Sequence, residues 1–175
     1  MASMECDPIA GVPASGGSPE VVPCPDAEAV GPCIRVVRQV TPDLVEALGR
    51  LLPQLSERLQ APDAEALRRI VGSPSSVLLV AECGGCIVGS LTLVWYDVPS
   101  GRKAWIEDVV VDTAYRGRGL GRMLVERALA FARECAPVTV MLTSRPSREA
   151  ANALYRAVGF SLKQTNLYKL DIKEK

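Results

Sequence analysis

The stretch 105–122 constrains the fold more than any other part of this 175-residue chain. Residues 104–111 are largely apolar and β-branched, as in a buried strand, and a short turn follows them. The glycine-rich run 116–121 then leads directly into a stretch, 120–135, whose apolar residues recur at helical spacing. A strand that passes through a glycine loop into an amphipathic helix requires a sheet on which that helix can pack. The chain is therefore predicted to combine a sheet with helices.

Apolar periodicity and turn residues place the other elements. Strands are expected over 34–40, 77–82, 87–96, 104–111 and 138–143, with two closing strands within 160–172. Helices are expected after Thr41-Pro42 with an interruption at Pro53, then after Pro62, over 120–135 and over 147–158. Strands in a run followed by alternating helices and strands indicate an α/β (α+β) fold with a mixed sheet and helices on both of its faces.

Composition excludes several classes of protein. An apolar fraction of 48% and a charged fraction of 23% are those of a globular domain. The net charge is zero and aromatic residues make up only 5%, whereas nucleic-acid binders usually carry a basic surplus and stacking platforms. The chain has no histidine, which removes Ser-His-Asp and Cys-His catalysis and every His-containing zinc site. We expect no metal, no nucleic acid and no membrane among its partners.

The first 33 residues differ in composition from the rest. Residues 1–34 hold six of the thirteen prolines, five acidic residues and no Lys or Arg. This composition predicts a disordered acidic Pro/Gly-rich tail over 1–33, followed by one domain over 34–175. A signal peptide needs a basic n-region and a transit peptide needs arginines, yet the first basic residue is Arg35. The expected location is cytoplasmic.

Cys83 and Cys86 have the CxxC spacing of some redox and zinc sites. They flank Gly84-Gly85 between two predicted strands, which is the composition of a two-residue hairpin turn. Because neither a following helix nor a second ligand pair is present, we interpret them as small strand residues and assign them no function.

The glycine loop has the chemistry of a phosphate site. Glycines let the backbone approach an anion, the first N–H groups of a helix are unsatisfied, and the helix dipole and arginines add positive potential. Neither a dinucleotide fingerprint nor a P-loop fits the glycine positions, and an ordinary glycine turn before a helix is the alternative. The candidate binding residues are Arg116, Gly117, Arg118, Gly119, Leu120, Gly121 and Arg122.

Two separate motifs resemble the GNAT superfamily of acyl-CoA-dependent N-acyltransferases. The run 116–121 fits its Arg/Gln-x-x-Gly-x-Gly signature, and 151–160 resembles its Ala-x-x-(aromatic/Leu)-Tyr-x-x-x-Gly-Phe segment. Together they resemble a bacterial-type branch whose substrate is unassigned, while 107–111 is also similar to glucosamine-phosphate acetyltransferases. The resemblance implies a single-domain GNAT fold whose sheet is splayed between the fourth and fifth strands.

The same resemblance implies an enzyme, an N-acetyltransferase that moves the acetyl group of acetyl-CoA to a primary amine of a small molecule or peptide by direct attack. Loop 116–122 would hold the pyrophosphate. The backbone of Val109, Val110 and Val111 would pair with the pantetheine arm, and Asn152 is a further candidate for cofactor binding. Many members carry Asn at the position that corresponds to Arg148 here.

In this hypothesis Tyr155 is the acid that donates a hydrogen bond or proton to the leaving thiolate. The alternative is that Tyr155 is an aromatic residue of the core without a catalytic role. The candidates for the base that accepts the amine proton are Glu107, Asp108 and water. Strand alternation puts the two carboxylates on opposite faces of the sheet unless a bulge intervenes. We favour Glu107. A GNAT-like domain that binds acyl-CoA without catalysis is the competing function. The amine substrate is the expected partner, and a homodimer is left open.

Overall fold

A computed structural model of the protein describes residues 31–56 and 58–172. Within these residues the chain divides into two compact parts, and the boundary between them in the sequence lies between Thr143 and Ser144. The predicted tail over 1–33 lies almost wholly outside the described residues. β1 includes Cys33, and Gly31 and Pro32 precede it without regular structure.

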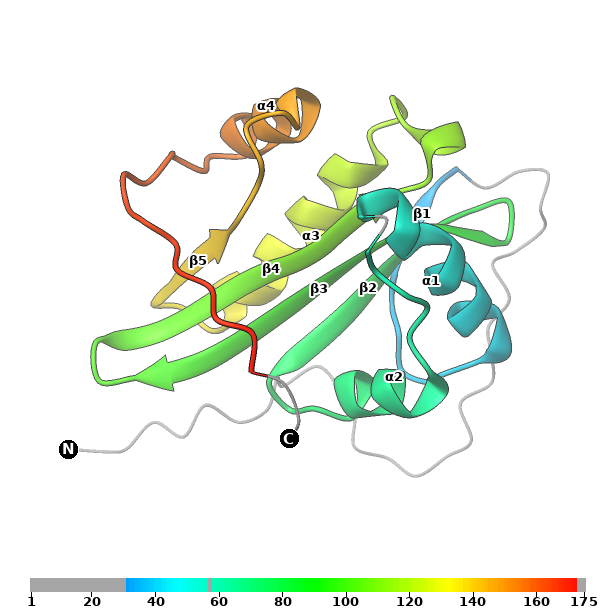
Figure 1. Ribbon diagram of the computed structural model, residues 1–175, viewed down its shortest axis with the longest axis horizontal. Coiled ribbons are helices and arrows are strands. Elements are labelled where there is room, and N and C mark those ends of the chain that lie inside the picture. Colours follow the sequence, from blue (N-terminus) through cyan, green and yellow to red (C-terminus); the bar gives the residue numbers. More distant parts are fainter. Residues whose placement is uncertain (1–30, 57, 173–175) are drawn as a thin grey trace. The chain divides into compact units, whose positions relative to one another are not determined.

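The first part holds a five-stranded sheet and its covering helices (Figure 1). Its elements are β1 (Cys33–Val36), α1 (Pro42–Leu55), α2 (Ala64–Val71), β2 (Ser76–Cys83), β3 (Cys86–Val98), β4 (Gly101–Val111), the 3-10 turn η1 (Thr113–Tyr115), α3 (Leu120–Glu134) and β5 (Val138–Leu142). The strands lie in the order β1-β2-β3-β4-β5, and each neighbouring pair is antiparallel except β4 and β5, which are parallel. The predicted mixed, mostly antiparallel sheet is confirmed.

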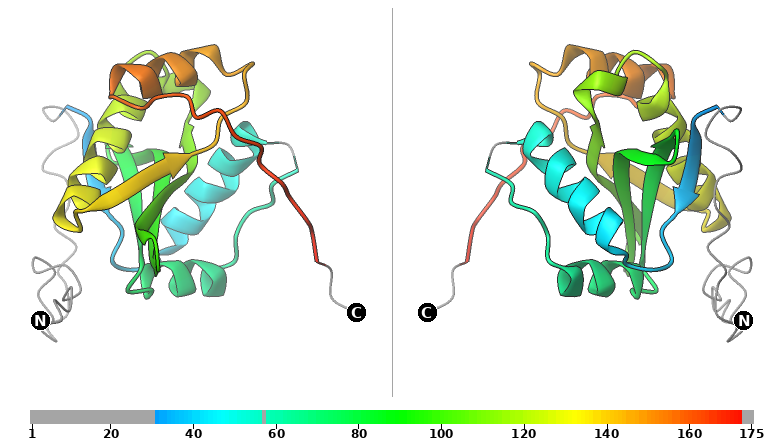
Figure 2. Two further views of the ribbon diagram at one scale, coloured as in Figure 1. Left: turned by 90° about the vertical axis from the view of Figure 1, so that its left-hand side faces the viewer. Right: turned by 90° about the vertical axis from the view of Figure 1, so that its right-hand side faces the viewer.

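Helices cover both faces of this sheet, as predicted. α1 and α2 lie against one face and α3 against the other (Figure 2). Side-chain alternation explains the division, since Leu78 and Val80 of β2 point toward α1 and α2 while Leu79 points the other way. Both faces are therefore buried, and β2 reads as a continuous apolar run.

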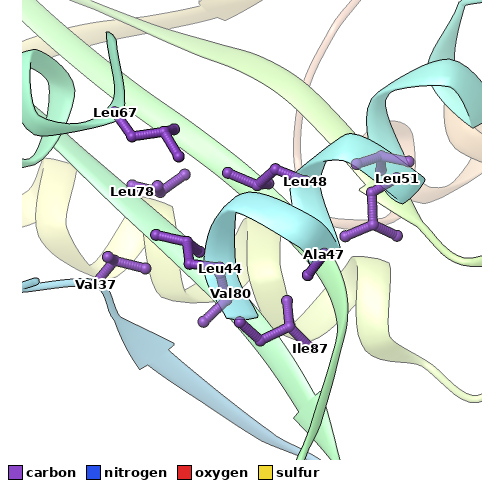
Figure 3. Packing of buried hydrophobic residues seen from close by; sticks show 10 residues of the cluster. Val37, Leu44, Ala47, Leu48, Leu51, Leu67, Leu78, Val80 and Ile87 are labelled. Carbon is purple, nitrogen blue, oxygen red and sulfur yellow. The ribbon is translucent and has the colours of Figure 1, made fainter. Parts of the chain in front are cut away.

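The core beneath α1 and α2 consists of large aliphatic side chains that interlock between the helices and the sheet (Figure 3). Leu44, Leu48 and Leu51 recur along one stripe of α1, and Leu51 is fully buried. Thr41 caps α1 by accepting a hydrogen bond from Leu44 N at 3.3 Å, and Asp63 caps α2 by accepting one from Ala66 N at 2.6 Å. The two caps fix where the helices begin, and burial of the leucine stripe holds α1 against the sheet.

The sheet opens between β4 and β5. Their pairing runs from Arg102 opposite Val138 to Ile106 opposite Leu142 and stops there. Residues 107–111 continue β4 but pair with β3 alone. The predicted splay between the fourth and fifth strands is confirmed.

The predicted interruption of the first helix at Pro53 is wrong. Pro53 does not interrupt α1, which continues to Leu55. The proline lies in the last turn, where it removes one N–H donor, and Ser56 N still donates to Leu52 O at 3.1 Å.

The second part holds α4 (Glu149–Ala157) and the segment 158–172. The two closing strands expected within 160–172 are absent from this segment, which is irregular throughout. Its apolar side chains stay in solvent, with Leu162 88% and Ile172 89% exposed. Alternating apolar residues supplied the strand pattern, but a strand forms only when its backbone pairs with another strand.

Candidate functional site

An extra residue in β4 reorganises the sheet where it separates from β5. Ser90 of β3 lies opposite Val110 and Thr92 lies opposite Glu107, so that Leu91 alone faces two residues of β4, Asp108 and Val109. Asp108 has φ +50°, a left-handed conformation that Asp tolerates better than most residues. The register shift is a β-bulge, which was the condition under which both carboxylates could share a face.

The bulge brings Glu107 and Asp108 into one open cleft of about 500 Å³. The floor of the cleft is formed by β3 and β4, and its wall is formed by α2 and the turn that follows it. Besides the two carboxylates, the lining residues are Ala66, Arg69, Ile70, Ser73, Ser75, Ser76, Thr92 and Val94.

The cleft changes the acidity of both carboxyl groups. Displaced water raises the pKa of Glu107, and the neighbouring Asp108 charge raises it further. Displaced water likewise raises the pKa of Asp108. A carboxylate with a raised pKa accepts a proton more readily, so either group is chemically suited to act as a base.

The glycine loop ends at the N-terminus of α3. Gly117 and Gly119 have φ values of +76° and +79°, which glycine adopts without steric cost. Gly119 is the N-cap residue, and no side chain in the described part of the chain caps this helix. The first intrahelical hydrogen bond runs from Met123 N to Gly119 O at 3.0 Å, which leaves the amides of 120–122 without a partner in the helix. These amides lie at the positive end of a 15-residue helix, where they are chemically suited to bind an anion.

Three arginines of the loop are each held by a neighbour. Arg116 Nε donates to Val111 O at 3.0 Å, and the Arg118 guanidinium lies 5.0 Å from the centre of the Tyr115 ring. Arg122 forms an ion pair with Glu126, one turn later on α3, at 2.8 Å. A guanidinium has five N–H donors, so each arginine keeps donors for an anion.

Sequence reasoning missed the contacts that fix the start of this loop. Buried Asp112 forms an ion pair with Arg50 of α1 and accepts a hydrogen bond from Ala114 N at 3.0 Å. Gln54, one turn after Arg50, accepts a hydrogen bond from Thr113 N at 2.9 Å. The spacing of Arg50 and Gln54 places both on one face of α1, but no local pattern indicates which loop they contact.

The strand edge next to the loop has backbone groups without a strand partner. Val110 and Val111 pair with β3 on one side, Val109 belongs to the bulge, and beyond Ile106 no described residue of β5 pairs with these three residues on the other side. Val111 O accepts the Arg116 hydrogen bond there. An extended amide chain could therefore add along this edge.

Tyr155 and Asn152 both belong to α4 in the second part of the chain. Tyr155 is buried, with its ring edge-to-face to Phe160 at 6.2 Å. Burial raises the pKa of the Tyr155 hydroxyl, and the charge of Arg148 opposes this effect. Asn152 Nδ2 donates to Arg145 O at 2.8 Å, which holds the turn before α4 together.

Other candidate sites resolve simply. Gly84 and Gly85 form the expected tight turn with φ +57° and +76°, and Cys83 and Cys86 are free thiols at paired positions of the hairpin. No group of three metal-ligating side chains occurs within residues 31–56 and 58–172. In the same residues, no helix has the length and apolarity needed to span a bilayer.

A sequence model of the acetyltransferase (GNAT) family matches residues 42–160. The chain belongs to this family. The match includes the cleft, the glycine loop, α3 and α4, so every candidate site residue lies inside the GNAT region.

Individual GNAT relatives match parts of the chain. The N-alpha-acetyltransferase RimI of Mycobacterium tuberculosis is 37% identical over 95 residues, 54% of this chain and 58% of that protein. N-acetyltransferase 8 of Rattus norvegicus is 33% identical over 108 residues, 61% of this chain and 49% of its own length. The chain thus spans about half the length of these curated relatives.

A solved structure supports the fold. An aminoglycoside acetyltransferase from an uncultured soil metagenomic sample superposes with a TM-score of 0.71 and 22% identity, covering 81% of this chain and 97% of the other. At this identity the likeness concerns the fold alone.

The raised pKa of Asp108 predicts a pH-dependent stability. Its folded pKa lies above the unfolded value, so ionisation costs stability at neutral pH, and the cost disappears below the unfolded value of 3.8. Asp108→Asn keeps the left-handed backbone and removes the charge. We expect its melting temperature to exceed that of the wild type at pH 7 by about 1–2 °C, because the cost of displacing water from a partly exposed carboxylate is only a fraction of a kcal/mol.

The measurement is a pair of thermal melts at pH 7 and near pH 3. Glu134→Gln, an exposed carboxylate in the last turn of α3, is the control for charge loss elsewhere. A difference between wild type and Asp108→Asn that is the same at both pH values would contradict the electrostatic explanation.

Proposed function

We propose that this GNAT protein is an acetyl-CoA-dependent N-acetyltransferase that acetylates a primary amine of a small molecule or peptide. The observation that carries the proposal is the uncapped N-terminus of α3 behind a loop with two left-handed glycines and three arginines. The loop combines free amides, the helix dipole and guanidinium donors, which are the groups that recognise a pyrophosphate. In this proposal Arg116, Gly117, Arg118, Gly119, Leu120, Gly121 and Arg122 bind the pyrophosphate of coenzyme A.

The pantetheine arm would bind along the opened edge of β4. Its two amides would hydrogen-bond to the backbone of residues 109–111, as an added strand does. The end of β4–β5 pairing at Ile106 supports this assignment, because the added amide chain needs a stretch with no strand on that side. Asn152 is held by Arg145 O in the turn before α4, and we retain it as a candidate contact through its side-chain oxygen.

The proposed reaction is direct transfer. The amine nitrogen attacks the thioester carbonyl, a C–N bond forms, the C–S bond breaks, and one proton leaves the nitrogen. Glu107 would accept that proton directly or through water, with Asp108 beside it as the alternative. Tyr155 would return a proton to the thiolate, and its raised pKa keeps the hydroxyl protonated at neutral pH.

The relatives support an amine acceptor without selecting one. The mycobacterial relative is named an N-alpha-acetyltransferase, which keeps an α-amine among the candidates. The cytoplasmic location remains a prediction, and the homodimer remains an open alternative.

The phosphate loop is tested by a pair of variants matched in shape and differing in charge, Gly119→Asp and Gly119→Asn. Both residues tolerate the left-handed backbone, and Gly119 has open space where a Cβ would be placed. An aspartate carboxylate at the helix N-terminus would satisfy the amides and repel the pyrophosphate. We expect acetyl-CoA affinity to fall about 100-fold in Gly119→Asp and distinctly less in Gly119→Asn, measured by calorimetric titration.

Melting curves accompany these titrations, because an aspartate there should leave α3 at least as stable as in the wild type. Unchanged acetyl-CoA affinity in a folded Gly119→Asp protein would remove the phosphate assignment.

The role of Tyr155 is tested by Tyr155→Phe, which keeps the ring and its packing on Phe160. A proton donated to the thiolate acts only in the transition state, so kcat should fall about 10²–10⁴-fold while acetyl-CoA affinity stays nearly constant. Steady-state turnover on an accepted amine is compared with acetyl-CoA titration of both proteins. A core aromatic without a catalytic role gives full turnover, and acetyl-CoA binding without turnover in the wild type would favour the non-catalytic alternative.

A further inference from the structure

The cleft carries an uncompensated negative charge. Glu107 and Asp108 are adjacent in the chain, the bulge turns both into the cleft, and neither forms an ion pair with any described residue. The effect of Asp108 on the acidity of Glu107 indicates that the two charges lie within electrostatic reach. One bound ammonium group would neutralise only one of them.

The rest of the lining offers little to an anion. Its single cation, Arg69, is paired with Glu65 one turn earlier on α2 at 3.2 Å. The Ser76 hydroxyl donates to Ile70 O at 2.7 Å, and the Ser73 and Ser75 hydroxyls are 3.2 Å apart in a hydrogen bond with each other. A carboxylate on the acceptor would therefore face two negative charges, and the one cation of the lining, Arg69, is already paired with Glu65.

An aromatic pair lies beside the cleft on the same face of the sheet. Register places Trp105 opposite Val94, and Val94 and Glu107 both line the cleft, so Trp105 shares their face of the sheet. Trp105 Nε1 donates to Tyr96 Oη at 3.1 Å, and Tyr96 is 45% exposed. Aromatic faces attract ammonium and guanidinium groups, so this pair is compatible with a bound cation. The chain's own Lys103 lies opposite Tyr96 on the same face, and the preference for a second positive charge therefore rests on the two carboxylates.

We propose that the acceptor is a primary amine that carries a second positively charged group, in preference to an amino acid zwitterion or a simple monoamine. Glu107 would face the reacting nitrogen and Asp108 would pair with the second cation. The inference rests on the proposed function, since it names the substrate class of the same site.

The test measures binding and chemistry separately. Three four-carbon amines differ only in the far end: 1,4-diaminobutane is a dication, 1-aminobutane a monocation and 4-aminobutanoate a zwitterion. Each is titrated at low salt into protein saturated with coenzyme A, which has no acetyl group to transfer. We expect the dication to bind about 5–10-fold more tightly than the monocation, beyond the twofold statistical advantage of two equivalent ends, and the zwitterion to bind most weakly.

Asp108→Asn should reduce the dication-to-monocation ratio to about the statistical twofold, because it removes the proposed partner of the second charge. Glu134→Gln, on the helix that covers the opposite face of the sheet, should leave the ratio unchanged. Equal binding of dication and monocation, an unchanged ratio in Asp108→Asn, or no binding of the dication at its highest soluble concentration would overturn the inference.

A parallel assay of thiol release from acetyl-CoA with the same amines distinguishes the two proposals. Charge-ordered binding without acetylation would contradict the proposed function and leave the charge preference standing. Acetylation of the amines without the expected order of binding would support the proposed function and contradict the charge preference.

Discussion

The bulge at Asp108–Val109 determines which side chains reach each face of the sheet from that point onward. Before it, Glu107 shares the α1 and α2 face with Thr92; after it, Val110 returns to that face and is buried in the core beneath α1. Without the extra residue, alternation would place Val110 on the other face, away from that core. The α1 core and the acidic cleft therefore depend on the same backbone irregularity.

The proposed coenzyme A site depends on how several elements meet at the end of β4. The strand loses β5 as a partner after Ile106, bulges at Asp108 and ends at Val111, and Arg50 of α1 holds the next residue, Asp112, in place. The glycine loop and α3 start from that fixed point. A pyrophosphate site built from backbone amides requires this fixation, because amides cannot be re-aimed as flexible side chains can.

Sequence predicted the parts whose signals are local. The strand, glycine loop and helix of 104–135 were recognisable from residue types alone, as was the Gly84-Gly85 turn. The sequence left undecided whether β4 contains a bulge, because the residues of one strand do not reveal its register with the partner strand. The Arg50–Asp112 contact, 62 residues apart, and the absence of strands within 160–172 depend on tertiary pairing that periodicity does not encode.

The proposed function rests on the binding of a pyrophosphate by backbone amides at the start of α3. NMR spectra of the ¹⁵N-labelled protein test it directly, with coenzyme A compared against pantetheine, which lacks the pyrophosphate. The account predicts that coenzyme A shifts the amide signals of Gly119, Leu120, Gly121 and Arg122 strongly and that pantetheine leaves them nearly unchanged. Equal shifts with both ligands, or shifts confined to other parts of the chain, would contradict it.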